Sequence, residues 1–135
     1  MADQLLSTQG VHHIGLTVPK LEYTVKFFTD ILGWQTVGEN PDYPAVFVSD
    51  GQVMITLWQA QETPIEFNRK RNIGLHHLAL RVENTAKLDA MHEHLRAHGV
   101  TIEFAPQAIA GLPLKHMMCY EPSGIRVEFI CESTE

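Results

Sequence analysis

A chain of 135 residues suits one compact domain, or two small modules that would each bury too little apolar surface to be stable alone. Hydrophobic residues make up 44% of the chain and charged residues 19%, and no apolar stretch is long enough to span a membrane. The formal net charge of −6 gives no general attraction to phosphate backbones. We therefore expect neither a nucleic acid nor a membrane as a partner.

Residues 1–9 are polar and lack the basic start and apolar core of a secretory signal, so we expect a cytoplasmic protein. A strand is predicted next, over residues 11–18, because branched residues alternate along it. Its sequence, VHHIGLTV, has a close counterpart in LHHLALRV over residues 75–82, with the same histidine doublet and the same apolar pattern. This repeat predicts a duplicated module.

Each repeated strand is followed by a predicted helix. The first helix covers residues 21–32 and ends before Gly33, and the second begins after the capping residue Asn84 and ends at Gly99. Three predicted strands follow each helix, over residues 34–39, 45–49, 53–60, 100–105, 115–120 and 125–131. We predict a single α+β domain over residues 1–135, made of two βαβββ modules (about 10–60 and 73–132) joined by a connection (61–72).

One histidine of each doublet should face inward, because a strand directs every second side chain to the same face. We assign His13 and His77 to the inward positions and their neighbours to the outward ones. Taken singly, a histidine in a strand is more often an ordinary core residue than a ligand. Two histidines in equivalent positions of a duplicated module instead favour a shared metal site.

Glu128 lies in an otherwise apolar predicted strand, between Val127 and Phe129. A buried carboxylate needs a cation, a metal or strong hydrogen-bond donors, and Arg126 and Arg81 are alternative partners for it. If both histidine strands line one cavity, then His13, His77 and Glu128 form a metal-binding set. Such a set holds a divalent transition metal and leaves other coordination positions open to substrate.

The preceding predicted strand carries His116, which shares a face with Met118 and Tyr120 if the strand is regular. His116 could act on a substrate as an acid or base, or it could face water at a sheet edge. The basic run Arg69–Arg71 in the connection is expected to be a solvated loop.

Four segments together resemble the vicinal oxygen chelate superfamily, which includes glyoxalases, bleomycin resistance proteins and extradiol dioxygenases. They are HIGLTV (13–18), ILGW (31–34), HLALRV (77–82) and EPSGIRVEF (121–129). The resemblance implies a partly open mixed β-barrel around a metal, with the helices outside and His13, His77 and Glu128 as ligands. It also implies a small-molecule substrate, and we expect a homodimer. The metal is expected to be Fe(II), Mn(II), Zn(II) or Ni(II).

A fourth ligand position, often glutamate or glutamine in glyoxalase I and methylmalonyl-CoA epimerase, corresponds to Thr56 in this chain. A hydroxyl is not basic at neutral pH, so this departure weighs against a symmetric proton shuttle. Three protein ligands instead resemble the extradiol dioxygenases, and His116 and Tyr120 are candidate catalytic residues beside the metal. We therefore favour dioxygenase-type chemistry. The alternatives are glyoxalase or epimerase-type isomerisation, and non-catalytic sequestering of a small molecule as in bleomycin resistance proteins.

Overall fold

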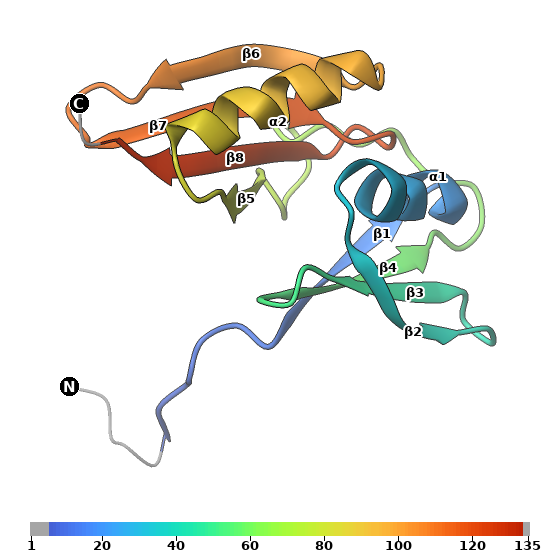
Figure 1. Ribbon diagram of the computed structural model, residues 1–135. Helices are drawn as coiled ribbons and strands as arrows, with labels where there is room; N and C mark the ends of the chain where they lie inside the picture. Colours follow the sequence, from blue (N-terminus) through green and yellow to red (C-terminus); the bar gives the residue numbers. More distant parts are fainter. Residues whose placement is uncertain (1–5, 134–135) are drawn as a thin grey trace. The chain divides into compact units, whose positions relative to one another are not determined.

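A computed structural model describes residues 6–133 and divides the chain after Gln61 into two compact units (Figure 1). Each unit carries one histidine doublet, one helical region and one four-stranded sheet. The two units are described one at a time below.

The first unit contains β1 (His13–Val18), α1 (Leu21–Lys26), β2 (Gln35–Asn40), β3 (Ala45–Ser49) and β4 (Met54–Gln59). Its sheet has the strand order β1-β4-β3-β2, in which β1 runs parallel to β4 and the other neighbours are antiparallel. Helix α1 packs against β3 and β4. Buried residues such as Val18, Val48, Ile55 and Leu57 form the core of this unit.

The second unit repeats this arrangement with β5 (Leu78–Arg81), α2 (Thr85–Ala97), β6 (Thr101–Ala108), β7 (Leu114–Tyr120) and β8 (Arg126–Glu132). Its strand order is β5-β8-β7-β6, again with one parallel pair, between β5 and β8. Helix α2 packs against β6, β7 and β8, and Figure 1 shows it lying along one face of the sheet. The prediction of two βαβββ modules is therefore confirmed.

The sequence predicts one regular helix over residues 21–32, but the structure has two helical segments there. After α1 the chain widens into a π-helical segment, η2 (Phe27–Ile31), in which the Leu32 amide donates to the Phe27 carbonyl at 3.0 Å. Phe27 and Phe28 are both almost completely buried, and Phe28 contacts Trp34. A π-helical turn holds one residue more than an α-helical turn, and here it allows two consecutive aromatic side chains to reach the core.

Strand β8 separates two kinds of side chain by its alternation. Val127, Phe129 and Cys131 are buried on the face that α2 covers, as the contacts between α2 and β8 indicate. Arg126 and Glu128 therefore point to the opposite face of the sheet. Within residues 6–133, no helix has the length and apolar character needed to cross a membrane.

The N-terminus of α2 depends on one side chain, because the Oδ1 atom of Asn84 accepts a hydrogen bond of 2.9 Å from the Lys87 amide. We expect Asn84→Ala to lower the free energy of unfolding by about 1 kcal/mol, since a lost cap leaves that amide without its partner. Urea denaturation measures the change. Asn84→Asp keeps an acceptor at the cap and should stay near wild type; equal losses in both variants would contradict a capping role.

Candidate functional site

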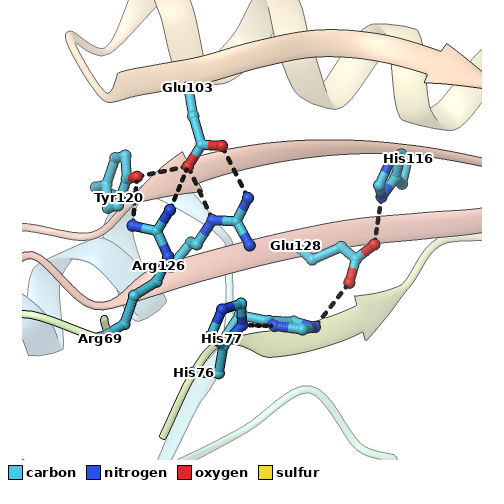
Figure 2. A network of polar contacts seen from close by, with 8 residues as sticks. All are labelled: Arg69, His76, His77, Glu103, His116, Tyr120, Arg126 and Glu128. Atoms are coloured by element: carbon cyan, nitrogen blue, oxygen red, sulfur yellow. Dashed lines mark hydrogen bonds and ion pairs between the residues drawn. The ribbon is translucent and has the colours of Figure 1, made fainter. Parts of the chain in front are cut away.

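The carboxylate of Glu128 lies between two imidazole rings on the face of the second sheet that is opposite α2 (Figure 2). Its Oε1 is 3.2 Å from Nε2 of His77, and its Oε2 is 2.5 Å from Nδ1 of His116. Glu128 is only 6% exposed. The cost of removing a carboxylate from water is offset here by two nitrogen partners.

The pairing of the strands explains why these three side chains meet. Ala79 of β5 and Met118 of β7 are the register partners of Glu128 on either side. His77 precedes Ala79 by two residues and His116 precedes Met118 by two, so both lie on the face of Glu128. His77 itself stands just before β5, which begins at Leu78. The predicted alternative of a water-facing His116 is wrong, because its side chain is 16% exposed and contacts Glu128.

The outer member of each doublet contacts the inner one. The Nδ1 atoms of His76 and His77 are 2.8 Å apart, and the Nδ1 atoms of His12 and His13 have the same separation. In each neutral pair, one ring donates to the other through these nitrogens. A hydrogen bond at Nδ1 leaves Nε2 of His77 available for Glu128 or for a metal, and such contacts orient metal-binding histidines.

The first unit has the same register without the acid. Gly15 pairs with Thr56, as Ala79 pairs with Glu128, so Thr56 is the structural counterpart of Glu128. Thr56 is 4% exposed, and its hydroxyl oxygen accepts a hydrogen bond of 2.9 Å from the Trp58 indole. The alignment of Thr56 with Glu128 made from the sequence agrees with this pairing.

Arg126 does not pair with Glu128, although it was one of the alternative partners. Its Nε and Nη2 atoms each donate to a different oxygen of Glu103, both at 2.8 Å. Glu128 is consequently left to the two histidines. Sequence reasoning did not find Glu103, because β6 is irregular and its register with β7 shifts on either side of Phe104.

Arg69 and Tyr120 complete a second cluster around Glu103 (Figure 2). The Tyr120 hydroxyl donates to Glu103 at 2.5 Å, and Arg69 donates to the Tyr120 oxygen at 3.0 Å and lies 3.8 Å from Glu103. The expectation of a solvated basic loop holds for Lys70 and Arg71 but is wrong for Arg69, whose side chain is 19% exposed. Tyr120 thus contacts the arginines rather than Glu128.

The contact with Arg126 is the main cause of a lowered pKa at Glu103. Hydrogen bonds from Arg126, and more weakly from Tyr120, outweigh partial burial and lower the pKa of Glu103 from 4.5 to about 2. The same contact with Glu103 raises the pKa of Arg126. The cluster is therefore fully charged at neutral pH, with two guanidinium groups around one carboxylate.

His77 and Glu128 are suited in chemistry and spacing to be metal ligands. Two donor atoms that each lie about 2.1 Å from the same ion are about 3.0 to 3.4 Å from each other. Nε2 of His77 and Oε1 of Glu128 are 3.2 Å apart. Within the part of the chain that the structure describes, no group of three or more histidine, cysteine or acidic side chains is arranged to hold a metal ion. His13, the third predicted ligand, belongs to the first unit and is exposed there.

Comparison with known proteins identifies the family. Residues 10–129 match the model of the Glyoxalase/Bleomycin resistance protein/Dioxygenase superfamily. The chain belongs to this superfamily. The match spans both units, including both histidine doublets and Glu128.

Three relatives of this superfamily member illustrate its range. A 2-epi-5-epi-valiolone epimerase from Actinomyces sp is 29% identical over 146 residues, which cover 90% of this chain and 78% of the relative. A glyoxylase/bleomycin resistance protein/dioxygenase domain from Frankia sp. EAN1pec has a TM-score of 0.81 and 25% identity, covering 95% of both chains. A mutant of the fosfomycin resistance protein FosX from Listeria monocytogenes, complexed with Mn(II) and 1S,2S-dihydroxypropylphosphonic acid, has a TM-score of 0.75 and 16% identity, covering 95% of both chains. The last likeness shows the fold alone.

Removal of the Glu103 charge should destabilise the protein in a pH-dependent way. Since folding lowers its pKa, the charge of Glu103 contributes stability fully above about pH 4.5, and this contribution is lost as the pH falls towards 2. We expect Glu103→Gln to lower the free energy of unfolding at pH 7 by about 1 kcal/mol, because partial exposure weakens the charged hydrogen bonds.

Urea denaturation between pH 7 and pH 2 would measure the difference between the variant and the wild type. The exposed Glu93, which pairs with Arg96 on α2, supplies the control Glu93→Gln, with little expected effect. A stability loss in Glu103→Gln that stayed constant down to pH 2 would rule out the proposed role of its charge.

Proposed function

We propose that this protein is a divalent-metal-dependent enzyme that binds two adjacent oxygens of a small organic substrate, with dioxygenase-type chemistry. The observation that carries the proposal is the convergence of His77 and Glu128 on one side of a sheet, with donor atoms 3.2 Å apart. Arg126 is bound to Glu103, so the Glu128 carboxylate has no guanidinium partner among these contacts and is suited to a metal.

The proposed ligands are His77, Glu128 and His13, the last from the same chain or from a second copy in a homodimer. Three protein ligands leave room at a divalent ion for substrate oxygens. When bound, the ion would supply a Lewis acid that polarises those oxygens. The Mn(II) complex of the FosX variant supports divalent metal binding in proteins of this fold.

The contrast between the two units favours open-site chemistry over a symmetric proton shuttle. The counterpart of Glu128 is Thr56, whose hydroxyl is buried and already accepts a hydrogen bond from Trp58. A hydroxyl group at this position is a poor base at neutral pH. Only one of the two equivalent positions therefore provides a carboxylate.

His116 is proposed as a positioning residue that acts through Glu128. Its Nδ1 donor holds the Oε2 oxygen, which leaves the other oxygen on the side of His77. The ring is also fixed by an aromatic contact with Phe104, at 5.0 Å between ring centres. His116 can hold or release a proton at this carboxylate during turnover. For Tyr120, the other predicted catalytic residue, we propose a supporting role in the arginine cluster, because it is hydrogen-bonded to Glu103 and Arg69.

Epimerisation is the second candidate, because the relative from Actinomyces sp is an epimerase and resembles 90% of this chain. An epimerase must remove a proton from carbon and return it on the opposite face. His116 is a possible base for such a reaction, although its partner on the opposite face would have to come from elsewhere.

Metal binding should depend on the two converging donors. We expect untagged wild-type protein to retain about one divalent ion per site, whereas His77→Ala and Glu128→Ala weaken binding by at least tenfold, because each removes a ligand. Elemental analysis and competition with a chelator measure this. His98→Ala, at an exposed position after α2, is the control. A wild-type protein without specific metal binding would instead favour a non-catalytic sequestering protein.

Dioxygenation consumes oxygen, whereas epimerisation does not. We expect the Fe(II)- or Mn(II)-loaded protein to consume oxygen with a member of a catechol panel, and His116→Gln to reduce kcat by about 100-fold while metal content is unchanged. An oxygen electrode measures turnover. Incorporation of solvent deuterium into hydroxy ketones without oxygen consumption would overturn the dioxygenase assignment and support epimerisation.

A further inference from the structure

Arg126 lies on the same face of the second sheet as Glu128 and belongs to a cluster that has more arginines than carboxylates. Arg69 and Arg126 surround Glu103, and the Tyr120 hydroxyl completes their network. One carboxylate neutralises one of the two guanidinium groups. The cluster consequently retains about one positive charge.

Arg69 shows that the cluster has unused donors. Its Nε atom is buried and has no hydrogen-bond partner within residues 6–133. Its side chain comes from a connecting segment without regular structure and reaches Tyr120 on β7. A buried guanidinium donor without an acceptor destabilises the folded protein. An anion bound at the cluster would accept hydrogen bonds from its donors and offset this cost.

Arg126 is the member of the cluster nearest to Glu128 along the chain. Both lie on one face of β8, two residues apart, or about 7 Å along a strand. Glu103 binds Nε and one terminal nitrogen of Arg126, and Figure 2 shows the other terminal nitrogen pointing away from Glu103. This nitrogen of a rigid planar group is therefore not used by Glu103 and can donate to a ligand.

The fold itself does not require this cation. Met54 lies two residues before Thr56 on β4, as Arg126 lies two residues before Glu128 on β8. Because Thr56 and Glu128 are counterparts, Met54 is the counterpart of Arg126. The first sheet therefore forms with an apolar residue at the equivalent place. At this position of the second sheet, a charged network lies beside the acid Glu128, which supports a role in binding.

We propose that Arg126, oriented by Glu103 and supported by Arg69 and Tyr120, binds a carboxylate group of the substrate beside the metal-binding oxygens. This inference rests on the proposed function and narrows its substrate class to small acids with two adjacent oxygens. The cluster of Arg69, Arg126 and Glu103 has a single net positive charge, which matches a carboxylate monoanion. The spacing of about 7 Å along β8 is comparable to the distance from the carboxylate oxygens to the para hydroxyl of a dihydroxybenzoate.

A matched pair of probes tests the carboxylate. We expect Zn(II)-loaded protein to bind 3,4-dihydroxybenzoate about tenfold or more tightly than the neutral 3,4-dihydroxybenzamide in a calorimetric titration. Arg126→Gln should remove this preference by weakening dihydroxybenzoate binding far more than dihydroxybenzamide binding, while Arg96→Gln, on the exposed surface of α2, should retain the preference. Equal affinities in the wild type, or a preference that survives in Arg126→Gln, would overturn the proposal.

A second measurement needs neither a variant nor a metal. Arginine labelled with ¹⁵N gives side-chain Nε–H signals for Arg69 and Arg126 in metal-free wild-type protein. We expect benzoate to shift both signals, and benzamide to leave them unchanged. Absence of a benzoate shift would contradict the carboxylate site even if Arg126→Gln failed to fold.

The two proposals can fail separately. If neither dihydroxy probe binds the metal-loaded protein but benzoate still shifts the arginine signals, then the oxygen-chelating function fails and the carboxylate site stands. If both probes bind with equal affinity and benzoate causes no shift, then the function stands and the carboxylate site fails.

Discussion

The two-point contact between Arg126 and Glu103 determines the chemistry of the whole face of the second sheet. Arg126 and Glu128 are two residues apart on β8 and share a face, so a direct ion pair between neighbouring side chains would have been the simple outcome. Glu103 prevents it by binding two nitrogens of the guanidinium. Glu128 is thereby left to His77 and His116, which can release it to a metal at lower cost than an arginine could.

The duplication supplies the framework, and differences between its copies supply the chemistry. Parallel pairing of the first strand with the last gives both units the same register, in which Thr56 corresponds to Glu128. Neither sheet needs a charge at that position to form. The polar face of the second unit thus reflects substitutions on a shared scaffold, as expected where function is placed on an existing fold.

The strands and the second helix could be predicted from the sequence because their alternation, caps and terminal glycines are local signals. The π-helical turn after α1 could not, since it depends on burying Phe27 and Phe28 together in the core. His77 and Glu128 were found through repetition and through the cost of burying an acid. Glu103 and Arg69 were missed because an irregular strand and a long connection give no periodic pattern from which to infer contacts.

Gly15 leaves space beside Thr56 in the first unit. A Cβ atom at this position would lie 3.1 Å from the Thr56 hydroxyl oxygen, whereas Ala79 carries a Cβ beside Glu128 at the equivalent pairing. The glycine therefore keeps space next to Thr56 that a longer side chain could use. Thr56 is the one residue at which the two pairings differ in having an acid, so a carboxylate placed there would give each half its own acid on the same backbone.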